Sequence, residues 1–261
     1  MLILRSLLFN IAFYVNLTVI MIGGLPTMLF SRARILDVAR VWAHSSLWLL
    51  DKICGLKVEF RGHEHLQSLG DRGFIIAAKH QSAWETFALL TQMRDFTFIV
   101  KRELTQIPLF GLYLSRSNQI AIDRASRSAA LRDLIQQAGA AIAEGRAIFI
   151  FPEGTRRAAG APPHYKSGVT HLYAATGAPC LPAALNSGLF WPRRTFIRRP
   201  GTVVIEFLPP IEAGLPNAEF AGILQERIET ATGRLIAEAL AKDPSLAVNL
   251  EKSDAAAAGA A

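Results

Sequence analysis

The chain has 261 residues, of which 51% are hydrophobic, and its formal net charge is +7. A chain of this length buries a full core without disulfides, and the distant Cys54 and Cys180 have no metal-binding or redox spacing, as expected of reduced thiols in a cytosolic compartment. The positive charge and a mean hydropathy of +0.27 favour anionic lipid or a phosphorylated small molecule as partner. No nucleic-acid-binding module is present, which argues against nucleic acid.

The first predicted elements are two apolar helices. Residues Ser6 to Phe30 carry no charge and lie between Arg5 and Arg32. No small-residue cleavage site follows, which argues against a removable signal peptide. The break at Gly23-Gly24-Leu25-Pro26 leaves an uninterrupted helix of roughly 26 Å, slightly short of a bilayer span. A second helix is predicted from Thr27 to Ile53. Two arrangements stay open: a hairpin that dips into one leaflet, or one span plus an interfacial helix.

From Leu56 onward, short apolar strands alternate with helices. Strands are predicted over 58–61, 74–78, 96–100, 119–122, 147–151, 180–185 and 203–207, and helices over 83–92, 109–115, 126–143, 167–175 and 218–241. This alternation predicts an α/β domain with a mixed sheet flanked by helices. The predicted organisation is therefore membrane-associated helices over 1–55, the α/β domain over 56–245, and a disordered tail over 246–261 that ends in the low-complexity sequence SDAAAAGAA.

The first loop with candidate chemistry follows the strand FIIAA and contains His80 and Glu85. A histidine there can take a proton from an attacking hydroxyl, provided that a carboxylate orients its ring. On one continuous helix the two side chains would lie about 140° apart, so they meet only if His80 precedes the helix. Ser82-x-x-Glu85 is typical of a capping box that begins the helix at this point. The same capping box is an alternative explanation of Glu85.

The second loop is Phe151-Pro152-Glu153-Gly154-Thr155-Arg156, directly after the strand AIFIF. Gly154 and Thr155 can turn backbone N–H groups toward an anion, and Arg156 supplies a cation with a two-pronged fork of donors. Glu153 is an acceptor for a glycerol hydroxyl. An ordinary strand-to-loop turn with a surface arginine is the alternative.

Two further cations follow strands. Lys101 ends the strand FTFIV, and Arg124 follows Ile122-Asp123. Each charge taken singly fits a solvated surface position. Because ligands bind at the carboxyl ends of the strands in open α/β sheets, the four loops together predict one site.

These motifs resemble, in content and order, those of the glycerolipid acyltransferase family. They are His80-x4-Glu85, the segment from Lys101 to Gly111, Ile122-Asp123-Arg124, the FPEGTR hexapeptide at 151–156, and the apolar run that ends in Leu181-Pro182-Ala183. The resemblance spans roughly residues 56–210 and extends to the N-terminal hairpin. The first motif departs from the family's usual HX4D, because Glu85 stands where the family has aspartate. Glutamate keeps the charge and adds one methylene.

The resemblance implies transfer of an acyl chain to the sn-2 hydroxyl of 1-acyl-glycerol-3-phosphate (lysophosphatidic acid), giving phosphatidic acid at the cytoplasmic face of the inner membrane. The donor would be acyl-CoA or acyl-carrier protein, and no bound cofactor or metal is expected. His80 would deprotonate the hydroxyl, Glu85 would orient His80, and Glu153 would position the glycerol. The phosphate ligands implied are Lys101, Arg124 and Arg156. Oxyanion donors are expected among the backbone N–H groups near Gly154.

Two other functions stay open at this level. The first is acylation of another lysolipid such as a lyso-ornithine lipid, against which three phosphate cations argue. The second is a non-catalytic membrane-binding relative, against which the intact His80–Glu85 pair and FPEGTR argue. No Gly-x-Ser-x-Gly sequence is present, so no covalent acyl-enzyme is expected.

Overall fold

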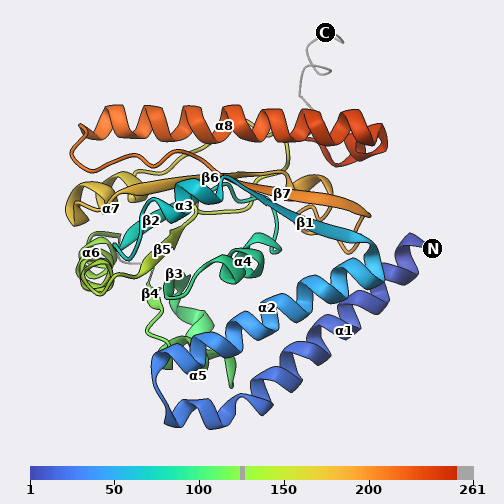
Figure 1. Ribbon diagram of the computed structural model, residues 1–261, viewed down its shortest axis with the longest axis horizontal. Coiled ribbons are helices and arrows are strands. Elements are labelled where there is room, and N and C mark those ends of the chain that lie inside the picture. The colour runs from blue at the N-terminus through green and yellow to red at the C-terminus, as the bar shows by residue number, and fades with distance from the viewer. Residues whose placement is uncertain (124–126, 252–261) are drawn as a thin grey trace.

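The computed structural model describes residues 1–123 and 127–251. Figure 1 shows a twisted central sheet with helices on both of its faces. Within the described residues the sheet has seven strands in the order β1-β7-β6-β2-β5-β3-β4. The strands are β1 (Leu56–Arg61), β2 (Phe74–Ala78), β3 (Phe96–Lys101), β4 (Ile120–Ile122), β5 (Ala147–Ile150), β6 (Cys180–Leu185) and β7 (Gly201–Phe207).

The sheet is mixed, as predicted. Strands β6, β2, β5, β3 and β4 are parallel neighbours. Strand β7 pairs antiparallel with β6, and β1 runs parallel to β7. The carboxyl ends of β6, β2, β5, β3 and β4 therefore lie along one edge of the sheet.

Helices cover both faces of this sheet. Figure 1 places α6, α7 and α8 on one face, and α4 with the N-terminal hairpin on the other. The α-helices are α1 (Leu2–Gly23), α2 (Arg32–Cys54), α3 (His63–Gln67), α4 (Glu85–Ala88), α5 (Phe110–Arg116), α6 (Arg127–Ala143), α7 (Gly168–Thr176) and α8 (Asn217–Lys242). Short 3₁₀ helices are η1 (Leu25–Leu29), η2 (Leu89–Gln92), η3 (Arg102–Gln106), η4 (Ser187–Leu189) and η5 (Pro244–Asn249). The helix predicted over 83–92 begins later than expected and divides into α4 and η2.

Strand β2 lies at the centre and is buried on both sides. Its side chains alternate between two apolar cores, because successive residues of a strand point to opposite faces. Ile76 packs with the hairpin and α4, whereas Ile75 packs with α6, α7 and α8. Burial on both faces explains the uninterrupted apolar sequence FIIAA.

The two N-terminal helices form a hairpin that packs against the domain along its length. The turn requires glycine at position 24, because a Cβ there would lie 2.6 Å from the Tyr113 hydroxyl and 2.7 Å from Val38. Tyr113 of α5 donates a hydrogen bond of 2.8 Å to the Met21 carbonyl near the end of α1. At the other end of α1, the buried Ser6 hydroxyl accepts from the Arg198 backbone N–H at 2.9 Å.

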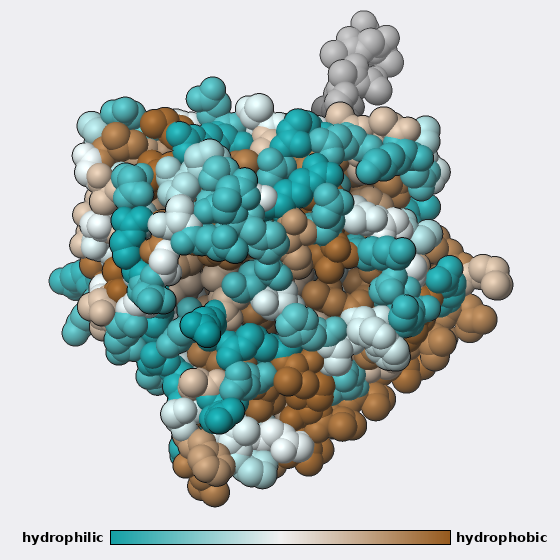
Figure 2. Space-filling view, in the orientation of Figure 1, coloured by the Kyte–Doolittle hydropathy of each residue, from teal (hydrophilic) through white to brown (hydrophobic). Residues whose placement is uncertain are grey.

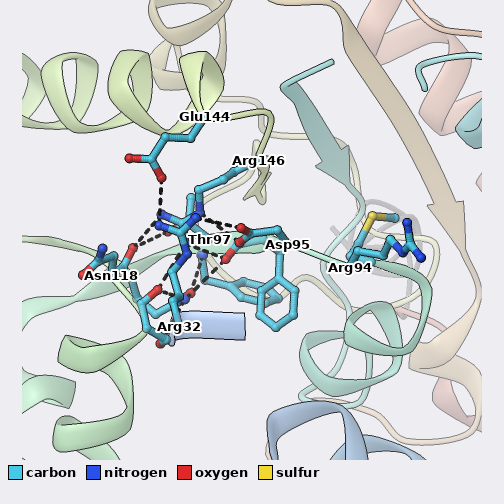
Figure 3. Close-up of polar contacts among 12 residues, drawn as sticks. Arg32, Arg94, Asp95, Thr97, Asn118, Glu144 and Arg146 are labelled. Atoms are coloured by element: carbon cyan, nitrogen blue, oxygen red, sulfur yellow. Dashed lines mark hydrogen bonds and ion pairs between the residues drawn. The ribbon is translucent and has the colours of Figure 1, made fainter. Parts of the chain in front are cut away.

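Ion pairs fasten the beginning of α2 to the sheet. Figure 3 shows Arg32 between two carboxylates, 2.7 Å from Asp95 and 2.8 Å from Glu144. Asp95 also pairs with Arg146, whose side chain is 3% exposed. Asp95 and Arg146 directly precede β3 and β5, so the hairpin turn is anchored near the amino ends of these strands.

The ordered structure extends beyond the boundary predicted at residue 245. Leu246 of η5 is 2% exposed, and the Glu251 N–H donates to the Ala159 carbonyl at 2.8 Å. These residues pack on the domain because Leu246 completes its core. The rest of the predicted tail, residues 252–261, lies outside the described residues.

Candidate active site

Three of the four predicted loops meet at one edge of the sheet. His80 follows β2, residues 152–156 follow β5, and Lys101 ends β3. These strands are parallel neighbours, so their carboxyl ends are adjacent. Arg124 lies outside the described residues.

His80 and Glu85 form a hydrogen-bonded pair. The distance between His80 Nδ1 and Glu85 Oε1 is 2.9 Å. The Glu85 side chain is fully buried, and that of His80 is 14% exposed. Because the carboxylate accepts the Nδ1 proton, Nε2 carries the lone pair that a general base needs.

Glu85 acts both as the partner of His80 and as a helix-capping residue, and both sets of contacts use the same oxygen. Glu85 Oε1 accepts hydrogen bonds of 2.7 Å from the backbone N–H groups of Gln81 and Ser82, which is half of a capping box. Helix α4 begins at Glu85, so His80 precedes the helix as the pairing requires. The turn that begins the helix therefore also orients the carboxylate toward His80.

Contacts from the segment after β6 to Glu85 and Gln81 were not predicted from the sequence. The Ser187 hydroxyl donates to Glu85 Oε2 at 2.8 Å, and the Gly188 N–H donates to Gln81 Oε1 at 2.9 Å. Ser187 and Gly188 belong to η4, which follows β6. Strand β6 is parallel to β2 and ends at the same edge, so the rule that located the other loops would have pointed to Ser187.

The FPEGTR loop contacts the base directly. The rings of His80 and Phe151 stack with centroids 4.0 Å apart and an interplanar angle of 17°. The Arg157 N–H donates to the His80 carbonyl at 2.8 Å. These contacts fix the position of His80 relative to the residues that follow β5.

Gly154 has a φ of +65°, which favours glycine. Its N–H donates to the Phe151 carbonyl at 2.8 Å and closes the turn, so the expectation of an oxyanion donor at Gly154 itself is not supported. Thr155 and Arg156 are exposed and line a cavity, and Lys166 lines it beside them. A Cβ on Gly154 would lie 3.2 Å from the Lys166 ammonium, a cation that no sequence motif indicated.

Glu153 is placed differently from the other predicted ligands. Its side chain is 1% exposed, and its carboxylate lies 3.1 Å from the buried ammonium of Lys79. Burial raises the pKa of Glu153, although the charge of Lys79 opposes the shift. Glu153 is not among the residues that line the cavity, so the structure does not bring it together with Lys101 and Arg156.

The cavity has a volume of about 990 Å³ and two chemically distinct parts. His80, Lys101, Thr155, Arg156 and Lys166 contribute polar groups. Most of the remaining wall is apolar, and much of it comes from the N-terminal hairpin. The hairpin residues are Leu17, Ile20, Met21, Ile35, Leu36, Val38, Ala39 and Trp42. The apolar sequence of the hairpin indicated contact with a membrane but did not indicate this wall.

This arrangement defines a class of protein. A histidine base with a buried carboxylate lines the same large, mostly apolar cavity as several cations, which suits acyl transfer to a hydroxyl of an anionic amphiphile. No group of three or more His, Cys, Asp or Glu side chains in residues 1–123 and 127–251 is placed to hold a metal ion.

The chain belongs to the acyltransferase family. Residues 57–186 match the family model described as Acyltransferase. The chain is 34% identical over 207 residues to a 1-acyl-sn-glycerol-3-phosphate acyltransferase from Pseudomonas aeruginosa. The aligned region covers 79% of this chain and 79% of that relative. It is 28% identical over 167 residues to a protein of the same name from Limnanthes alba, covering 63% of this chain and 57% of that relative.

A solved structure has the same fold. The crystal structure of the 1-acyl-sn-glycerophosphate (LPA) acyltransferase PlsC from Thermotoga maritima matches with a TM-score of 0.75 at 25% sequence identity. The match covers 90% of this chain and 98% of that one, so it extends beyond the residues 57–186 that match the family model.

Proposed function

We propose that the protein transfers an acyl chain from an acyl thioester to the sn-2 hydroxyl of 1-acyl-glycerol-3-phosphate, giving phosphatidic acid. The observation that carries this function is that His80, paired with Glu85, shares one cavity with Lys101, Arg156 and Lys166. A phosphate monoester carries about 1.5 to 2 negative charges at pH 7, which several cations match better than one. The apolar wall suits acyl chains, and relatives named for this activity support the same acceptor.

The geometry supports direct attack on the thioester. His80 Nε2 takes the hydroxyl proton as the oxygen bonds to the thioester carbonyl carbon. The resulting imidazolium is stabilised by the Glu85 carboxylate at 2.9 Å and then returns the proton to the departing thiolate. The products are the new ester and a free thiol. Acyl-CoA and acyl-carrier protein both supply such a thioester as co-substrate, and the scheme requires no bound cofactor.

The exposed face of α1 supports attachment to a membrane. Figure 2 shows hydrophobic atoms along the edge at which Figure 1 places α1. The large apolar side chains exposed on this helix are Ile3, Leu4, Leu7, Leu8, Ile11, Tyr14, Val15, Val19 and Ile22. Helix α1 is long and apolar enough to cross a membrane by length and composition. Because both of its ends bond to the domain, we place it within one leaflet, at the cytoplasmic face of the inner membrane.

Arg156→Ala tests the recognition of phosphate. The change removes the guanidinium fork, so the KM for 1-acyl-glycerol-3-phosphate should rise at least about tenfold, the equivalent of about 1.4 kcal/mol. The assay uses purified protein with acyl-CoA and with acyl-carrier protein as donors. Arg157→Ala is the matched control, because Arg157 is the next residue, does not line the cavity and keeps its backbone bond to His80.

A lysolipid that lacks the phosphate completes this test. The wild-type protein should acylate it much less efficiently than 1-acyl-glycerol-3-phosphate. Equal rates on the two acceptors would contradict the phosphate site and would favour a lyso-ornithine-type substrate instead.

A further inference from the structure

An ionic cluster centred on the buried side chains of Lys79 and Glu153 lies next to the active site. Lys79, the residue before His80, is 2% exposed, and its ammonium lies 3.1 Å from Glu153 Oε1 and 2.7 Å from Glu229 Oε1. The Tyr165 hydroxyl donates to the same oxygen of Glu229 at 2.9 Å, and its ring centre lies 5.9 Å from the ammonium. The proposed chemistry uses none of these contacts.

Stability alone does not explain the cluster. The cost of removing charges from water commonly offsets the attraction within a buried ion pair, and apolar replacements are often as stable. The cluster does, however, join four segments at one point. They are the end of β2, the loop after β5, the segment before α7, and α8.

The contacts of Glu153 show what the cluster holds in place. Glu153 stands between Pro152 and Gly154, in the turn that Gly154 closes at a φ of +65°. The Pro152 carbonyl accepts from the Lys166 N–H at 2.9 Å. Anchoring the Glu153 carboxylate therefore fixes the backbone that presents Arg156 and Lys166 to the cavity. The His80 ring is also held by the Glu85 carboxylate, which bonds to the backbone of residues 81 and 82 and not to this loop.

We propose that Lys79 and Glu229 are positioning residues for the phosphate-binding loop, and that Glu153 acts through Lys79 and does not touch the substrate. The Lys79 ammonium holds the Glu153 carboxylate inward, while Glu229 and Tyr165 hold the ammonium from α8 and from the segment before α7. Arg156 is thereby aimed at an anionic phosphate group on the acceptor. The identity of that group rests on the proposed function.

A double-mutant cycle tests how Glu153 acts. Lys79→Met and Glu153→Gln should each raise the KM for 1-acyl-glycerol-3-phosphate about tenfold, with a smaller change in kcat, because a loosened loop weakens binding while His80 stays in place. The double variant should be no worse than Lys79→Met alone, since Glu153→Gln breaks an interaction that Lys79→Met has already removed. If Glu153 contacts the substrate, the two effects will multiply, and this result would overturn the proposal.

The double variant also guards against misfolding. Lys79→Met alone leaves two carboxylates without their cation, which can cost enough stability to unfold the protein. In Lys79→Met/Glu153→Gln a neutral amide replaces the Glu153 carboxylate, and Glu229 keeps its bond from Tyr165. Tyr173→Phe is the matched control for a general loss of stability. It removes a hydroxyl that bonds to the Glu212 carbonyl and the Leu215 N–H, away from the cavity, so it should lower the melting temperature without changing KM.

Hydrogen exchange provides a readout that needs no substrate. The backbone amides of residues 153–157 should exchange faster in the double variant than in the wild type, and at the wild-type rate in Tyr173→Phe. A folded double variant with unchanged exchange in this segment would overturn the positioning role. If the wild type fails to acylate 1-acyl-glycerol-3-phosphate, the proposed function is wrong, while the exchange experiment still decides whether Lys79 orders the loop.

Discussion

At the scale of single residues, the Glu85 carboxylate takes part both in the turn that begins α4 and in the pair with His80. One oxygen bonds to the base and to two backbone N–H groups, and the other accepts from Ser187. A side chain with this many partners has a single orientation, and its bond to Nδ1 fixes the orientation of the His80 ring. The extra methylene relative to aspartate is therefore accommodated without loss of the contact to Nδ1.

The His80→Ala variant tests the base. Loss of a general base lowers kcat by about 100-fold or more, and we expect at least this loss under saturating substrates. The fold should persist, because the bonds from Glu85 to the turn do not involve the ring. Melting temperature and liposome binding are the controls. Near-normal turnover by the folded variant would contradict the mechanism.

The Glu85→Gln variant separates the two roles of this side chain. A glutamine oxygen can still accept from the Gln81 and Ser82 N–H groups, and its amide nitrogen can donate to Ser187 Oγ. The melting temperature should therefore stay near that of the wild type. The charge that stabilises the imidazolium is lost, so kcat should fall by about tenfold or more. Unchanged kcat and melting temperature together would leave Glu85 with the capping role alone.

At the scale of elements, strand ends were the predictable part of the site. A short apolar run followed by a polar residue is a local pattern, so the positions of His80, Lys101 and the FPEGTR loop at strand ends could be predicted. The direction in which each side chain points depends on the conformation of the turn, which this sequence pattern does not specify. Glu153 and Arg156 are three residues apart, yet one is buried against Lys79 and the other lines the cavity. Lys79 and its partner Glu229 are 150 residues apart, which no local pattern connects.

The hairpin shows a similar limit. Its apolar composition indicated helices near a membrane, and the structure has two helices there. Which face of a helix packs inward depends on what it packs against. Phe9 of α1 is fully buried, while Leu8 is 53% exposed. The sequence therefore could not show that α1 and α2 form a wall of the cavity.

The outward face of α1 gives a prediction at this scale. Leu8→Lys/Val15→Lys places two charges on a face whose side chains are 53% and 56% exposed, so folding should be preserved. The fraction of protein that sediments with anionic liposomes should fall at least about tenfold, since each charged group strongly disfavours an apolar environment. Val248→Lys is the matched control, because Val248 is 65% exposed and lies in η5, outside the hairpin. Equal sedimentation of both variants would contradict membrane attachment through α1.

At the scale of the whole molecule, the hairpin and the α/β domain share one core. Phe9, Leu36, Ala43 and Leu50 are buried in the same apolar cluster as Ile76 of β2. Burial of each large apolar side chain contributes about 1.5 to 3 kcal/mol. Removing the N-terminal helices would uncover this cluster and open the cavity, so a truncated protein does not isolate membrane attachment. Substitutions on the outer face are the cleaner test.

The shared cavity yields the last prediction, which concerns acyl-chain length. Ala39 of α2 lines the cavity and is partly buried against the core. Ala39→Phe places a ring in space that an acyl chain would occupy, so long chains should lose more contacts than short ones. Each buried methylene contributes about 0.8 kcal/mol, and exclusion of two would change relative efficiency by about tenfold.

The measurement compares kcat/KM for long-chain and short-chain acyl-CoA in the two proteins. We expect the ratio to fall by about tenfold in Ala39→Phe, which corresponds to the two excluded methylenes. Val41→Phe is the control, because Val41 lies on the same helix with 57% of its surface exposed and does not line the cavity. Val41→Phe adds the same ring outside the cavity, so the ratio of kcat/KM for long-chain to short-chain acyl-CoA should not change. If Ala39→Phe leaves the ratio unchanged while its melting temperature shows a folded protein, the donor chain does not occupy the part of the cavity that α2 encloses. The hairpin would then contribute to membrane attachment and to the core, but not to the choice of substrate.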